Sequence, residues 1–128
     1  MAQLVTYRDL VVWQKAMDLV MEVYNLTSKF PKLEIYGLIA QMKRSAISIP
    51  SNIAEGRRRS SRKDYCQFLI ISYGSGAELE TQIEIAKRLN FVSQQDCKIA
   101  EDLLAEVMKM LNKILFTLRS NFPKKLNS

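Results

Sequence analysis

Residues 41–63 read QMKRSAISIPSNIAEGRRRSSRK and join a helical apolar stripe to a cluster of positive charge. The stripe recurs in steps of three and four, the period of one helix face, and consists of Ile35, Ile39, Met42, Ala46, Ile49 and Ile53. Pro50 removes one backbone hydrogen bond inside it, so we predict a continuous helix that is kinked near Pro50. Gly56 then predicts a left-handed C-terminal cap. This stretch therefore indicates a helix that ends beside a basic cluster.

Polar residues surround the proline and allow two interpretations. They are Ser48, Ser51, Asn52 and Glu55. Such groups either form a polar ligand site or satisfy the backbone groups that a proline leaves without partners. The second role is the more common one, and it is the one predicted here.

A first helix is predicted upstream. Thr6 and Asp9 have the spacing of a capping box, and a broad apolar periodicity follows them directly, so the helix should start near Thr6. The pair Phe30-Pro31 should end it, because a residue that precedes proline is pushed out of helical geometry. The second helix should then begin near residues 32–34, with Glu34 at the positive end of its dipole.

Two further helices are predicted downstream. Ser61 with Asp64, and Ser93 with Asp96, have capping spacing, and Asn90 is a candidate cap at the end of the third helix. Glycines at positions 74 and 76 weaken a helix, which indicates close approach of another helix. The fourth helix should run without a break until the polar tail of residues 121–128, which we expect to fray.

Length and composition favour one helical domain over residues 1–120. The chain has 128 residues, only four glycines and three prolines, and no repeat. Four helices with short connections predict an all-α, antiparallel up-and-down four-helix bundle. The first and third helices carry more apolar surface than one bundle face requires. We therefore expect a homo-oligomer, and the alternative is a monomer with an unusually apolar core.

Several classes of function are disfavoured. The chain has no histidine, which removes the commonest general base and metal ligand. The carboxylates of Glu78, Glu80 and Glu84 lack the histidines that a di-metal bundle site uses. Neither a phosphate-binding glycine loop nor a nucleophile elbow is present, so we expect no enzyme activity, no metal and no cofactor.

The expected cellular location is the cytoplasm. The N-terminus lacks the pattern of a secretory signal, and the longest uncharged stretch has 13 residues, too few to cross a membrane. Cys66 and Cys97 match no metal or redox spacing, and we interpret them as reduced thiols on helices.

The basic residues that follow Gly56 are the strongest candidates for a binding site. Of the net charge of +6, residues 32–64 contribute +5, with eight basic and three acidic side chains. Clustered arginines form bidentate contacts to phosphates, and each neutralised phosphate adds salt-dependent affinity. The candidate nucleic-acid-binding residues are Arg57, Arg58, Arg59, Arg62 and Lys63, with Lys43 and Arg44 either extending the patch or facing elsewhere. The alternative is solvated charge that interacts favourably with a helix C-terminus.

Four segments carry a distinctive pattern: YRDLVVWQKAMDL at residues 7–19, FPKLEIYGL at 30–38, QMKRSAISIPSNIAEG at 41–56 and GSGAELETQIEIAKRL at 74–89. Together they resemble the small four-helix bundle proteins encoded in intervening sequences of bacterial 23S ribosomal RNA genes. The resemblance extends to about residue 90, and SIPSNIAEG followed by ELETQ is its most specific part.

The resemblance implies a ring-like homopentamer and kinship to the accessory proteins of diversity-generating retroelements, which bind nucleic acid and a reverse transcriptase. No enzymatic activity is associated with the family. We therefore expect a non-enzymatic oligomer that binds RNA or other nucleic acid through repeated basic clusters. The alternative is an adaptor for a protein partner, such as a reverse transcriptase, without a specific nucleic-acid role. The expected partners are further copies of the chain, RNA or DNA, and a protein, but no membrane.

Overall fold

The computed structural model describes residues 6–120. Within this range the chain forms only helices and turns, so the predicted all-α class is confirmed. The α-helices are α1 (Val11–Thr27), α2 (Leu38–Arg57), α3 (Arg62–Arg88) and α4 (Gln94–Ser120), and two short 3-10 helices are η1 (Tyr7–Asp9) and η2 (Lys32–Glu34). The predicted fraying tail, residues 121–128, lies outside the described residues.

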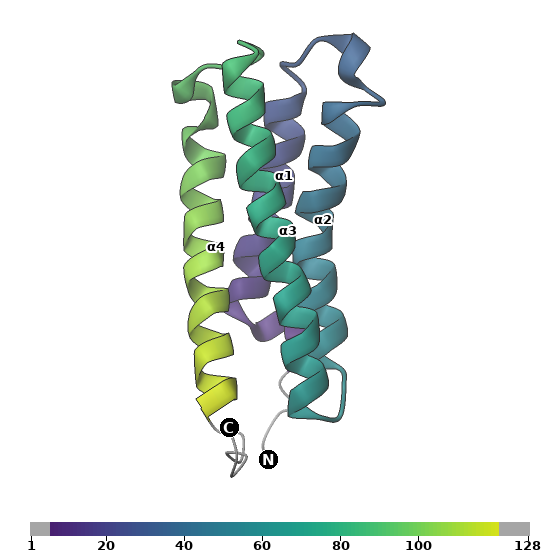
Figure 1. Ribbon diagram of the computed structural model, residues 1–128, viewed down its shortest axis with the longest axis vertical. Helices are drawn as coiled ribbons and strands as arrows, with labels where there is room; N and C mark the ends of the chain where they lie inside the picture. The colour runs from purple at the N-terminus through teal and green to yellow at the C-terminus, as the bar shows by residue number, and fades with distance from the viewer. Residues whose placement is uncertain (1–5, 121–128) are drawn as a thin grey trace, which may run out of the picture.

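The four α-helices lie side by side along the long axis of the molecule, with their connections at alternate ends (Figure 1). Helix α1 packs against α2 and α4, and α3 packs against the same two helices. Neither α1 with α3 nor α2 with α4 makes a close backbone contact within the described residues, so these pairs are diagonal. The contact between α2 and α3 is the most extensive one. The seam between these two helices positions both sites described below.

The core is built from the apolar residues that recur in steps of three and four. On α1 they are Val12, Ala16, Leu19, Val23 and Leu26, and on α4 they are Cys97, Ala100, Leu104, Val107, Leu111 and Leu115. Burial of one such stripe on each helix supplies the main favourable free energy of folding. Cys66 and Cys97 are free and buried, and burial raises the pKa of the Cys97 thiol above its usual value.

The first helix begins later than predicted. Thr6 and Asp9 do form a capping box, in which the Thr6 N–H donates to Asp9 Oδ2 at 3.1 Å, but the box caps only η1. Leu10 is extended (φ −75°, ψ 125°), so α1 starts at Val11. The predicted start near Thr6 is therefore wrong, because the capping box closes a separate 3-10 turn.

The connection between the first two helices is also longer than predicted. Helix α1 ends at Thr27, and Phe30 lies beyond it, packed against Phe91 with ring centroids 5.5 Å apart. Residues 32–34 form only η2, and α2 begins at Leu38. Glu34 still caps α2, since its Oε1 accepts a hydrogen bond from the Leu38 N–H at 3.2 Å. The predicted helix start at residues 32–34 is therefore wrong, although the Glu34 carboxylate does lie at the positive, N-terminal end of α2.

Helix α2 continues through Pro50. The Asn52 amide donates to the Ser48 carbonyl at 2.8 Å and to Ser48 Oγ at 3.0 Å, and Ser72 Oγ donates to the Ile49 carbonyl at 2.9 Å. These bonds reach the carbonyls of Ser48 and Ile49, whereas the carbonyl that loses its donor to Pro50 is that of Ala46, four residues earlier, so the predicted satisfaction of the interrupted backbone stays a prediction. The kink stays a prediction.

Gly56 contradicts its predicted role as a helix cap, and of the two glycines in α3 only Gly76 shows the predicted close approach of another helix. Gly56 has no positive φ and lies buried inside α2, so the predicted left-handed cap is wrong. A Cβ at this position would lie 2.7 Å from the Cβ of Phe68, which shows that Gly56 permits α2 and α3 to approach closely. Gly76 likewise contacts the Met108 side chain of α4, as the predicted close approach requires. A Cβ at Gly74 would meet no neighbouring atom of this kind within 4 Å in the part of the chain that the structure describes.

The caps of the second half follow the sequence signals. Ser61 Oγ accepts from the Asp64 N–H at 3.0 Å at the start of α3. Asn90 has φ 61° and ends that helix, with the Phe91 N–H bonded to the Ala86 carbonyl. This is the hydrogen-bond pattern of a Schellman motif. Each of these helix ends is therefore specified by residues close to it in the sequence.

The start of α4 is closed by a complete capping box. The Ser93 N–H donates to Asp96 Oδ2, and the Asp96 N–H donates to Ser93 Oγ. The hydrogen bond from the Ser93 backbone lowers the pKa of the Asp96 carboxyl, as does the hydrogen bond from Lys29. The predicted Ser93 and Asp96 cap is therefore present.

Candidate nucleic-acid interface

The junction between α2 and α3 gathers five cations at one end of the bundle, the lower end in Figure 1. Arg57 is the last residue of α2, and Arg62 is the first residue of α3. The turn between them is held by hydrogen bonds from the Arg58 N–H to the Ala54 carbonyl and from the Arg59 N–H to the Gly56 carbonyl. All five side chains are exposed; they belong to Arg57, Arg58, Arg59, Arg62 and Lys63, named here the junction cluster.

Two of these arginines lie over aromatic rings of α3. The Arg59 guanidinium carbon is 4.9 Å from the Phe68 ring centroid, and the Arg57 guanidinium carbon is 5.9 Å from that of Tyr65. Arg59 also pairs with Glu55 at 3.3 Å, one helical turn away. Exposed pairs of this kind contribute little free energy, because water screens them and two long side chains must be ordered. A phosphate can therefore compete for these guanidinium groups.

Tyr65 provides a fixed ring beneath the cluster. Burial raises the pKa of its hydroxyl, and the nearby Arg57 charge partly offsets that rise. The phenol is thus uncharged at neutral pH and does not form an anionic partner for the arginine. The ring orients the Arg57 side chain without neutralising it.

Lys43 and Arg44 do not belong to the junction cluster. They precede Arg57 by at least 13 positions on one helix, which corresponds to about 20 Å. The Lys43 ammonium lies 4.3 Å from the centroid of the Tyr24 ring on α1, whereas Arg44 lines a groove that faces α3. The seven predicted site residues are therefore divided into one cluster of five and two separate cations on different sides of α2.

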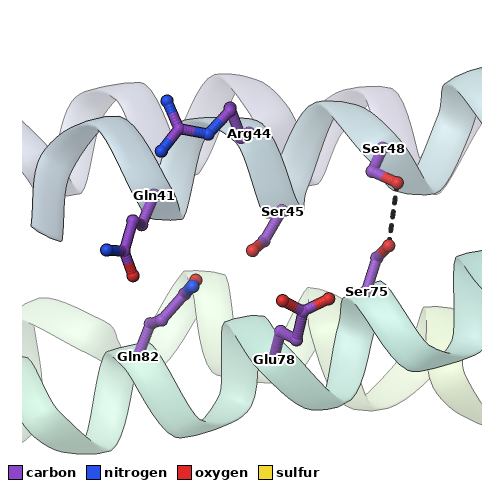
Figure 2. Close-up of a pocket in the computed structure, with 7 residues that line it drawn as sticks. All are labelled: Gln41, Arg44, Ser45, Ser48, Ser75, Glu78 and Gln82. Atoms are coloured by element: carbon purple, nitrogen blue, oxygen red, sulfur yellow. Dashed lines mark hydrogen bonds between the residues drawn. The ribbon is translucent and has the colours of Figure 1, made fainter.

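The groove beside Arg44 was not predicted as a site. It is about 290 Å³ in volume and polar, and its lining residues are Gln41, Arg44, Ser45 and Ser48 of α2 with Ser75, Glu78 and Gln82 of α3 (Figure 2). Ser48 Oγ and Ser75 Oγ are joined by a hydrogen bond of 2.8 Å at one end. The spacing of these polar residues in the sequence places them on one face of each helix. Only the packing of α2 on α3 brings the two polar faces together.

The acidic side chains of residues 6–120 do not form a metal site. That range holds no group of three or more histidine, cysteine, aspartate or glutamate side chains arranged to bind a metal ion. Glu84 is paired with Arg88 at 3.0 Å, and this hydrogen bond lowers the pKa of its carboxyl. The same range contains no helix with the length and apolar character needed to cross a membrane.

Comparison with known proteins places this fold in a family. A search of curated proteins found no significant match. A solved structure from Bacteroides thetaiotaomicron, described as a protein of unknown function from the S23 ribosomal protein family, superposes with a TM-score of 0.76 at 24% identity; the match covers 82% of this chain and 98% of that one. At this identity the likeness shows the fold. The family model of the 23S rRNA-intervening sequence proteins matches residues 8–113, so the chain belongs to the 23S rRNA-intervening sequence protein family.

Proposed function

We propose that this chain is a non-enzymatic, cytoplasmic protein that binds RNA or other nucleic acid through copies of the junction cluster presented by a homopentamer. The observation that carries the proposal is the placement of five exposed cations at a single end of the bundle. Such a patch attracts polyphosphates at long range and binds them by releasing counterions. Repetition in an oligomer strengthens this binding, because contacts after the first become intramolecular.

Exposed apolar side chains support self-association. On α1 they include Met17, Met21 and Tyr24, and on α3 they include Ile70, Ile71, Tyr73 and Ile85. Since α1 and α3 are diagonal in the bundle, these side chains lie on two different faces. A ring needs two different patches on each subunit, one for each neighbour, whereas a twofold dimer needs only one. We therefore propose a closed ring of antiparallel up-and-down bundles, each with a kinked second helix.

An RNA-binding assay across a salt series tests the proposal. We expect binding of a structured RNA hairpin to weaken steeply between about 50 and 300 mM salt. The triple variant Arg57→Ala, Arg58→Ala, Arg59→Ala should bind more weakly, and its slope of log affinity against log salt should fall by about one for each phosphate that the variant no longer neutralises. Fluorescence anisotropy of a labelled hairpin measures both quantities.

A matched control removes the same charge elsewhere. Lys32, Arg88 and Lys98 are exposed cations near the opposite end of the bundle. Their triple alanine variant should retain most of the affinity and nearly the whole salt slope. Equal losses in the two triple variants would mean that net charge, rather than the junction cluster, controls binding. Unchanged binding by the arginine variant would refute the proposed site.

A protein-interaction adaptor is the second candidate, and one observation favours it. The connection between α1 and α2, at the opposite end from the junction cluster (Figure 1), exposes three large apolar side chains. Leu33 is 95% exposed, Tyr36 is 93% exposed and Ile35 is 56% exposed. Such groups are enriched where proteins bind one another. If the native protein co-purifies with one enriched protein, for example a reverse transcriptase, and without RNA, the adaptor is favoured.

A further inference from the structure

The groove between α2 and α3 contains a buried acceptor without a partner. Gln82 is 9% exposed, and its Oε1 atom has no hydrogen-bond partner among the described residues. A buried carbonyl oxygen of this kind loses its hydration without gaining a protein hydrogen bond, so it favours any donor that enters the groove. The amide of Gln82 is directed from α3 toward α2 (Figure 2).

Two more oxygen acceptors face the same space. Ser45 is 7% exposed, and its hydroxyl lines the same groove. The Glu78 carboxylate points toward Ser45 and has no ion pair in the described part of the chain. Figure 2 shows Ser45, Glu78 and Gln82 converging from the two helices. Their combined chemistry is one negative charge beside neutral oxygen acceptors.

We propose that this groove binds a guanidinium group. A bound group must donate hydrogen bonds to Gln82 Oε1 and carry positive charge to pair with Glu78. A guanidinium presents five N–H donors in one plane and is more weakly hydrated than an ammonium, so it enters a partly buried site at lower cost. Glu78 disfavours an anion beside Gln82, and Arg44, the cation that also lines the groove, is directed away from these acceptors. The group belongs either to a small free compound or to an arginine side chain of a second copy of this chain.

Arg44 is the internal competitor for the site. Its side chain lines the groove, but its guanidinium is directed away from the α3 residues in Figure 2 and forms no ion pair with Glu78. An Arg44 that turned inward would fill the groove itself and leave no room for another guanidinium. The variant Arg44→Gln therefore distinguishes binding of an external guanidinium from occupation of the groove by Arg44 itself.

The test is an NMR titration of the full chain with methylguanidinium chloride. Methylammonium chloride and sodium chloride serve as controls at the same ionic strength. We expect saturable shifts of the Gln82 side-chain amide with methylguanidinium, and weaker binding of methylammonium. Glu78→Gln and Gln82→Leu should each weaken methylguanidinium binding by about tenfold, because each removes one acceptor of a charge-assisted contact. Arg44→Gln should not weaken methylguanidinium binding, because Arg44 lines the groove without supplying an acceptor and its positive charge opposes a bound cation.

Light scattering on the same variants distinguishes the two sources. If the ligand is a free compound, Glu78→Gln and Gln82→Leu bind the probe less but keep the mass of the parent assembly. If it is an arginine of a second copy, both variants lose mass, excess methylguanidinium reduces the mass of the parent, and Arg44→Gln does neither. Circular dichroism verifies that each variant is folded.

Two results would overturn the proposal. The first is the absence of a saturable shift in the parent together with unchanged mass in the Glu78 and Gln82 variants. The second is probe binding that appears only after Arg44→Gln, which would make Arg44 the occupant. Neither result bears on RNA binding, because the junction cluster lies about 18 Å along α2 from Ser45.

Discussion

Leu69→Ala should lower the free energy of unfolding by about 2–5 kcal/mol, since it removes a fully buried side chain from the core and leaves a cavity. Leu69 is 0% exposed on α3, the helix that contacts both α2 and α4. Urea unfolding followed by circular dichroism measures the loss. Protein concentration must be held fixed in all samples, because assembly adds to apparent stability.

Ile70→Ala is the matched control for this prediction. Ile70 is the next residue on α3 but is 42% exposed, so its truncation should change the unfolding free energy of a single chain by less than about 0.5 kcal/mol. Its expected effect is on self-association, because it belongs to the exposed apolar face of α3. If Ile70→Ala is as costly as Leu69→Ala at low protein concentration, the orientation of α3 about its own axis is wrong.

Gly56→Ala is expected to destabilise the protein by about 1–3 kcal/mol, even though alanine is the better helix former. The added methyl group would lie 2.7 Å from Phe68 Cβ and 3.1 Å from a ring carbon of Tyr65. A Cβ atom is fixed to the backbone, so relief requires α2 and α3 to move apart along their most extensive contact. Thermal and urea unfolding both report this cost.

Gly74→Ala should have the opposite effect on stability. Among residues 6–120, no atom outside its own helix lies within 4 Å of a Cβ at this position, so the substitution should stabilise α3 by about 0.5–1 kcal/mol. A stabilising Gly56→Ala would contradict the close approach of α2 and α3. A destabilising Gly74→Ala, by contrast, would indicate that another chain packs against this part of α3.

Local signals explain why the second half of the chain was predicted best. Ser61, Asn90 and Ser93 bond to backbone groups within a few residues, so sequence spacing alone specifies their roles. Gly56 has no such local signature. A glycine near a helix end is equally compatible with a left-handed cap and with close packing, and only the position of Phe68 decides between them.

The junction cluster and the groove also differ in how far the sequence alone could predict them. The junction cluster is contiguous in sequence, so its five cations were predicted together and lie together. Lys43 and Arg44 are adjacent in sequence, yet they face α1 and α3 respectively. The groove joins residues more than 25 positions apart, such as Ser48 and Ser75, and exists only once two helices have packed. Its acceptor chemistry therefore could not be predicted from either helix alone.

The mass of the assembled protein tests the central claim most directly, because repeated presentation of the junction cluster depends on self-association. Light scattering at micromolar concentration and moderate salt gives this mass without a label. The proposed homopentamer predicts about five times the chain mass of 14.8 kDa. A single species with the mass of one chain would contradict it.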